Sequence, residues 1–276
     1  MSAGTAASPR SPRRDGTTST YAPRPGAAPL PRMIAAQTVF ETKMLLRNGE
    51  QLLLTVIIPS LLLVLFSAVD IVAVPTDTAG GAGRSVDFLA PGILALAVMS
   101  TAFTGQAIAT GFERRYGVLK RLGASPLPRW ALMTAKTLSV LVTEVLQIVL
   151  LTVIALALGW SPHGNPFTVL LLLVLGTAAF SGLGLLMAGT LKAEATLAAA
   201  NLVFLLLLVG GGVIVPMDKF PGGVRSVLEL LPISALSDGL RDVLQHGASM
   251  PWGDLGILVV WAVLGLGAAA RFFRWE

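Results

Sequence analysis

The sequence predicts an all-α membrane protein with six transmembrane helices, and three observations carry that prediction. Hydrophobic residues make up 54% of the 276 residues, while charged residues make up only 13%, against about 25% in soluble domains. The charged residues lie at the edges of long apolar runs. These runs are long enough to cross a hydrocarbon core, which needs about 20 residues of helix. The composition therefore excludes a soluble enzyme.

Six apolar segments are expected to cross the membrane, each separated from the next by a turn or a charged link. The octet from Gly159 to Pro166 divides the longest apolar run into two spans. Tryptophans flank the third and sixth spans, as expected of residues at the membrane interface: Trp130, Trp160, Trp252 and Trp275. The expected spans cover residues 51–74, 88–112, 130–159, 166–191, 195–217 and 252–272.

The N-terminal residues 1–31 are rich in Ser, Thr, Gly, Arg and Pro. They lack the apolar core of a signal peptide, so we expect a disordered cytoplasmic tail, followed by a six-span domain over residues 32–276. Basic residues near span ends are retained in the cytoplasm. The Lys and Arg residues that would fall outside the cell are few: Arg84, Lys219, Arg225 and Arg241, of 20 in all. Both termini are therefore predicted to be cytoplasmic.

The connection between the second and third spans, residues 111–129, predicts a short amphipathic helix. Phe112, Tyr116 and Leu119 fall on one helical face, and Gly123 suits a helix C-terminus. With basic flanks, such a helix can lie on anionic headgroups or press its apolar face into a groove of a cytoplasmic partner. A solvated basic loop that only enforces the topology is the alternative.

The segment between the fifth and sixth spans predicts two short helices on the outer side. Three glycines, residues 210–212, weaken the fifth span near its outer end. Two apolar stripes follow, over residues 224–231 and 236–244, and Pro232 resets the chain direction between them. Amphipathic helices too short to span are typical of interfacial or re-entrant elements.

These two segments resemble the permease subunits of type-2 ATP-binding-cassette exporters, in particular the daunorubicin-resistance-like drug exporter group. In the first segment the matching residues are Glu113, Arg114, Gly117, Leu119, Lys120, Leu122, Ser125, Pro126 and Arg129. In the second segment they are Pro216, Pro221, Pro232, Asp238 and Arg241. One position departs from the pattern, because Leu231 stands where relatives have Asn before the proline.

The resemblance implies a plasma-membrane subunit that exports a lipophilic compound, such as a drug, an antibiotic or a lipid. It implies two permease copies, identical or different, and separate ATPase subunits that carry ATP and Mg. The outer motif would form a re-entrant gate. The coupling helix against the ATPase would comprise Glu113, Arg114, Arg115, Gly117, Leu119, Lys120, Ser125 and Pro126.

A polar stripe on the third span provides candidates for the translocation path. Lys136, Ser139, Thr143, Glu144 and Gln147 share one face of an otherwise apolar helix. A charge at mid-depth costs about 3 kcal/mol or more, so Glu144 should either line a wet cavity or make a packing hydrogen bond to another helix. The predicted path residues are Glu144, Gln147, Thr143, Gln106 and Asn201.

Several chemistries are excluded because their residues are missing. The chain has no cysteine, no phosphate-binding loop, no nucleophile elbow and no HExxH motif, so we expect no catalytic residue, metal site or cofactor on it. The basic residues face membrane lipid rather than nucleic acid. ATP hydrolysis would therefore have to reside on a partner chain. The main alternative to an ATP-driven exporter is a proton-coupled secondary transporter with Glu144 as the proton carrier.

Overall fold

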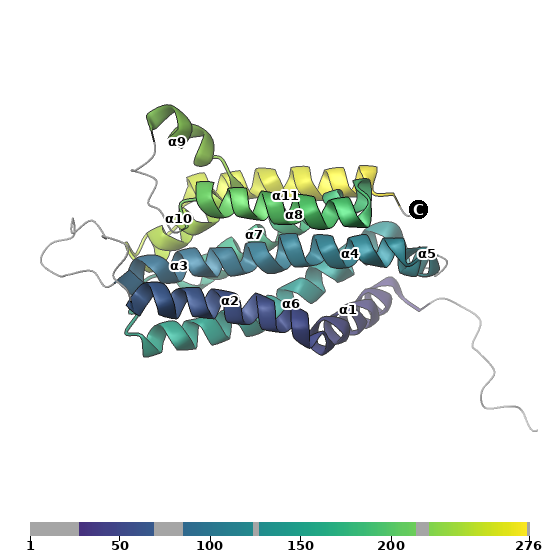
Figure 1. The fold of residues 1–276 in the computed structure, drawn as a ribbon, viewed down its shortest axis with the longest axis horizontal. Coiled ribbons are helices and arrows are strands. Elements are labelled where there is room, and N and C mark those ends of the chain that lie inside the picture. The colour runs from purple at the N-terminus through teal and green to yellow at the C-terminus, as the bar shows by residue number, and fades with distance from the viewer. Residues whose placement is uncertain (1–27, 69–84, 124–126, 214–220, 275–276) are drawn as a thin grey trace, which may run out of the picture.

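The protein is a bundle of long helices that run side by side along one axis (Figure 1). The computed structural model describes residues 28–68, 85–123, 127–213 and 221–274. Every regular element in those four ranges is helical, which confirms the all-α prediction. Residues 1–27 of the expected tail lie outside the described residues, and α1 (Leu30–Arg47) begins just before the expected domain boundary.

Five helices are long and apolar enough to cross a membrane: Ser85–Arg115, Trp130–Ala157, Pro166–Thr190, Ala193–Gly210 and Trp252–Phe272. The expected first span forms α2 (Gly49–Ala68), of which the described apolar stretch is Thr55–Ser67. The predicted end of that span, residues 69–74, lies outside the described residues. The structure thus supports a multi-pass membrane protein with five evident spans, and the six-span count stays a prediction.

The second expected span is one continuous rod made of three helical pieces. It consists of α3 (Ser85–Val98), the π-helix η1 (Met99–Gly105) and α4 (Gln106–Arg115). A π-helix inside an α-helix is rare and is frequently found at functional sites. No pattern in the sequence predicts this π-helix.

Within the bundle, α7 (Pro166–Thr190) packs along α11 (Trp252–Phe272). Gly182 of α7 lies so close to α11 that a Cβ atom would stand 2.6 Å from the carbonyl carbon of Gly265. Helix association in lipid depends on such close approach of small residues. This glycine contact therefore fixes the two spans against each other.

The third, fifth and sixth expected spans form α6 (Arg129–Ala157), α8 (Ala193–Gly210) and α11. The helix α8 ends at Gly210, earlier than the predicted residue 217, because the three consecutive glycines favour a non-helical backbone. Residues 214–217 of that prediction lie outside the described residues.

The connections gather at two opposite ends of the bundle. One end carries α1, α5 (Val118–Gly123) and the C-terminus, and the other carries α9 (Gly222–Leu228) and α10 (Pro232–Leu244) (Figure 1). At the first end, the Arg274 amide donates a hydrogen bond to the Gly189 carbonyl at 3.1 Å. At the second, the His163 amide donates to the Leu244 carbonyl at 2.9 Å. Connections that the sequence predicts on the same side of the membrane therefore lie at the same end of the bundle.

Candidate coupling and translocation sites

The predicted coupling segment consists of two helical pieces joined by a turn. α4 ends at Arg115, and α5 begins at Val118. Gly117 between them has φ +71°, a backbone conformation that glycine adopts without a steric penalty. The structure therefore divides the expected single helix at this glycine.

The turn also separates the apolar face that the sequence predicts. Leu119 is fully buried against Leu132, Leu185 and Phe273, so it anchors α5 to the bundle. Tyr116 is 68% exposed at the end of α4 and stacks on Phe112. Lys120 is exposed, while Ser125 and Pro126 lie outside the described residues.

Two predicted coupling residues bind the link between α7 and α8. Arg114 donates hydrogen bonds to the carbonyls of Gly189, at 2.7 Å, and of Leu191. These carbonyls lie at the C-terminus of α7, where a helix leaves acceptors without partners in its own backbone. Arg115 pairs with Glu194 in the first turn of α8. The arginines therefore fasten the coupling segment to the bundle.

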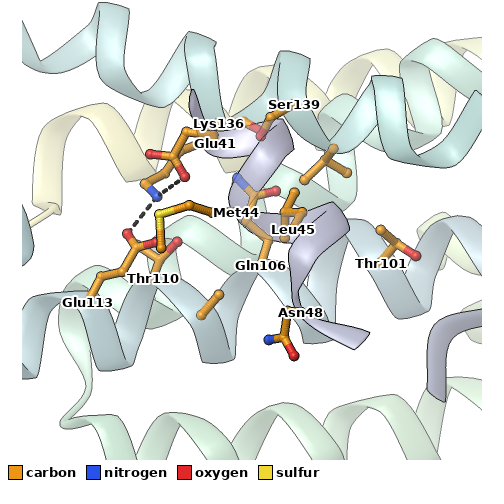
Figure 2. Close-up of a pocket in the computed structure, with 12 residues that line it drawn as sticks. Glu41, Met44, Leu45, Asn48, Thr101, Gln106, Thr110, Glu113, Lys136 and Ser139 are labelled. Carbon is orange, nitrogen blue, oxygen red and sulfur yellow. Dashed lines mark hydrogen bonds and ion pairs between the residues drawn. The ribbon is translucent and has the colours of Figure 1, made fainter. Parts of the chain in front are cut away.

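Glu113 belongs to a buried group of three charges. The Lys136 ammonium lies 2.6 Å from a carboxylate oxygen of Glu113 and 3.0 Å from one of Glu41 (Figure 2). Glu41, which comes from α1, is not among the site residues predicted from the sequence. One signal could have found it, since a lysine just inside a span requires a counter-charge.

A small polar pocket lies beside these charges, between α1, α4 and α6 (Figure 2). Its volume is about 110 Å³. Gln106 lines it, and neither amide atom of that side chain has a hydrogen-bond partner. The other polar residues that line it are Glu41, Asn48, Thr101, Thr110, Glu113, Lys136 and Ser139.

A much larger apolar groove runs between α2, the rod of the second span and α8. Its volume is about 640 Å³. Asn201 lines it together with Ser100 and Thr104 of the π-helix. Most of its wall is apolar: Ile58, Pro59, Leu62, Leu96, Ile108, Phe112, Leu197, Phe204 and Leu208. Among the five predicted path residues, Asn201 is the one that reaches this groove.

Glu144 packs against a neighbouring helix. It is 2% exposed, and its Oε2 accepts a hydrogen bond from the Thr177 hydroxyl of α7. Its Oε1 atom has no hydrogen-bond partner. It lines neither the polar pocket nor the apolar groove, so the geometry favours the packing interpretation.

Gln147 and Thr143 connect α6 to its surroundings in a similar way. Gln147 donates to the Thr55 carbonyl and accepts a hydrogen bond of 2.9 Å from Thr101. Thr143 donates to the Ser139 carbonyl of its own helix at 3.0 Å. Both also line a shallow apolar pocket between α2 and α6. Their role in translocation stays a prediction.

The outer motif converges on Arg241 of α10. Its guanidinium donates to the Val213 carbonyl and to the Asp238 carboxylate, each at 3.0 Å, and its carbon lies 3.9 Å from the centre of the Phe88 ring. Burial raises the pKa of the Asp238 carboxyl, and the charge of Arg241 opposes that shift. One side chain thus joins α10 to the neighbouring ends of α3 and α8.

The prolines of the motif have separate positions. Pro232 is buried at the start of α10, where a proline without an amide hydrogen is well suited. Pro221 precedes α9, and Pro216 lies outside the described residues. Within the described ranges, no group of three or more His, Asp or Glu residues could hold a metal ion.

Comparison with known proteins identifies the family. Residues 33–271 match the family described as ABC-2 family transporter protein. The transport permease YvfS of Bacillus subtilis (strain 168) is 24% identical over 240 residues, which cover 84% of this chain and 93% of YvfS. Linearmycin resistance permease protein LnrN of the same organism is 28% identical over 164 residues, or 58% of this chain and 43% of LnrN. The chain therefore belongs to the ABC-2 transporter permease family and is a multi-pass integral membrane protein.

Proposed function

We propose that this chain is the permease subunit of an exporter that moves a lipophilic compound out of the cell with ATP hydrolysed by a separate subunit. The apolar groove of about 640 Å³ is the observation that carries the proposal. Largely apolar cavities of this size, with a few polar groups, are typical of sites for small lipophilic ligands. The family, and a relative named as a resistance permease, support the same reading.

A second permease copy would complete the groove. The helix α8 exposes a row of apolar side chains next to it, Leu202, Leu205, Leu206 and Val209. In a symmetric dimer the same face of each subunit meets its counterpart. We propose that two such faces meet so that the two grooves form one path.

The ATPase would bind at the end that carries α5. Tyr116, Lys120 and Arg121 are exposed there, whereas Arg114 and Leu119 hold the segment to the bundle. An aromatic ring with basic neighbours suits a docking surface on a cytoplasmic partner. This assignment puts both termini in the cytoplasm. It requires that α2 also crosses the membrane, which makes six spans in all.

The proton-coupled alternative is not favoured. Its carrier would be Glu144, and a carrier carboxyl must exchange protons with water or cargo along a path. Glu144 contacts Thr177 and lines neither the groove nor the polar pocket.

Reconstitution with the partner ATPase tests the proposal. Vesicles that contain both chains should export a lipophilic fluorescent drug only with ATP and Mg, and a change of the phosphate-loop lysine in the ATPase should abolish export. Replacing Asn201 with Leu in the groove should change the KM for the drug and leave the ATPase bound. Export driven by a proton gradient without ATP would contradict the proposal.

A further inference from the structure

Three helices from different parts of the chain meet at one buried ammonium group. Lys136 belongs to α6, Glu41 to α1 and Glu113 to α4, and Glu41 is 95 residues from its lysine partner. The exposed fractions of these side chains are 6% for Lys136, 9% for Glu41 and 21% for Glu113. A second bond steadies Glu41, since Gln37 donates to its other carboxylate oxygen at 2.8 Å.

Lys136, Glu41 and Glu113 form a triad of unequal charge, because one cation pairs with two anions. Ion pairs shielded from water remain favourable only while every charge has its partner. Without Lys136, two carboxylates would face each other in an apolar setting. The lysine is therefore the group on which both acidic side chains depend.

The connection between α1 and α4 is polar rather than apolar. The helix α1 packs along α6, but the polar pocket separates it from α4 beside the triad. Figure 2 shows Glu41 and Glu113 approaching the same ammonium group from opposite sides. At this level, the ion pairs join α1 to α4.

Glu113 also stands one residue from the coupling contacts. Arg114 and Arg115 hold the link between α7 and α8, and the Gly117 turn leads into α5. A displacement of the coupling segment must therefore move Glu113. Through Lys136, the same displacement reaches α6 and α1.

We propose that Lys136 is a positioning residue that pairs with Glu41 and Glu113 at once and thereby makes α1, α4 and α6 move together when the ATPase moves the coupling segment. The inference rests on the proposed function and deepens it. It assigns α1 to the coupling unit, which neither composition nor motif indicates.

Two variants separate coupling from folding. The triple variant Glu41→Gln, Glu113→Gln, Lys136→Met removes all three charges together, and neutral replacement of a complete buried network often preserves stability. The single variant Glu41→Gln leaves the neutral Lys136–Glu113 pair intact and removes only the ion pair that α1 contributes. Both should keep the melting temperature and the bound ATPase, while drug exported per ATP hydrolysed falls at least about fivefold, the lower end of usual coupling between sites.

Two further variants serve as controls. Lys136→Arg keeps the positive charge and should restore most of the coupling that neutral replacement removes. Glu229→Gln breaks the exposed Arg225–Glu229 pair at the opposite end of the bundle and should export like the wild type.

A distance measurement reads the connection without cargo. The chain has no cysteine, so spin labels can be attached at Phe40 of α1, which is 51% exposed, and at Ile108 of α4, which borders the apolar groove. In the complex with the ATPase, the wild type should give one narrow distance distribution with and without a non-hydrolysable ATP analogue. Glu41→Gln should broaden it.

The outcomes distinguish the two proposals. If wild-type vesicles show no ATP-dependent export, the proposed function fails, and the label distances alone then decide on the triad. If Glu41→Gln or the triple variant exports with the wild-type ratio and keeps a narrow distribution, the role of Lys136 is wrong.

Discussion

Glu144 shows how a single polar residue is accommodated among apolar helices. It has one donor, the Thr177 hydroxyl, and that hydroxyl also lies 2.7 Å from the Leu173 carbonyl. Removing one member of a buried hydrogen bond leaves the other unsatisfied and costs about 1 to 3 kcal/mol. The contact joins α6 to α7, so its loss should weaken the bundle.

Glu144→Ala should therefore lower the melting temperature in detergent by an amount that corresponds to about 1 to 3 kcal/mol. Glu144→Gln retains the size and an acceptor oxygen and should stay close to the wild type. Thr177→Val, which removes the donor, is the matched control and should resemble the alanine variant. Thermal unfolding and ATP-driven efflux should be measured on the same samples. Loss of efflux in Glu144→Gln at an unchanged melting temperature would return Glu144 to the translocation path.

Arg241 differs from Glu144, because its side chain contacts three separate parts of the chain. A planar guanidinium can bind Val213 and Asp238 while it stacks on Phe88. A lysine ammonium is a compact point charge without that geometry. The positive charge alone is therefore not enough at this position.

Arg241→Lys should loosen the end of α8. A single cysteine at Val213, which is fully buried, should react faster with a membrane-impermeant maleimide in the Arg241→Lys background than in the wild type. Arg225→Lys changes a half-exposed arginine at the same end and should leave the rate unchanged. Equal labelling rates in all three backgrounds would show that Arg241 does not fasten α8.

At the scale of elements, the turn at Gly117 sets the direction in which α5, part of the predicted coupling segment, leaves α4. A Cβ atom there would meet no atom within 4 Å, so any effect of substitution comes from the backbone conformation alone. A residue other than glycine with positive φ costs about 1 to 2 kcal/mol.

Gly117→Ala should consequently shift the orientation of α5 and weaken binding of the ATPase. Copurification and stimulated ATP hydrolysis should both fall, while the yield in the membrane stays constant. Gly222→Ala on α9 provides the comparison, because that glycine also has open space around it and lacks a positive φ. If both alanine variants bind the ATPase equally, the turn does not position α5.

Most elements, but not their irregularities, follow from the sequence alone. Apolar runs predict the spans, and the glycine triplet indicates where α8 weakens. The π-helix could not be predicted, because its residues resemble any apolar helix and its neighbours lie far along the chain. Gly184 of α7 packs against its backbone, and Thr101 bonds to Gln147. Likewise, the sequence alone suggests that Glu41 lies on the surface, and only the packing of α1 on α6 shows that it is buried.

At the scale of the whole molecule, the positions of the chain ends bear on the number of spans. The helix α1 and the C-terminus lie at the same end of the bundle (Figure 1). An odd number of crossings between them would put them at opposite ends. Five helices meet the length and hydropathy expected of a span, and α2 as a sixth crossing would bring both to the same end, as the six-span prediction expects.

Single cysteines can test this arrangement in a chain that has none of its own. At the end that carries α10, cysteines at His163 and His246 should react in intact cells with an impermeant maleimide. At the end that carries α5, cysteines at Arg121 and Lys192 should react only after the membrane is opened, because basic residues are retained in the cytoplasm. All four positions are exposed, so labelling after opening the membrane controls for reactivity. Labelling of Arg121 in intact cells would invert the orientation and remove α5 from contact with any cytoplasmic ATPase.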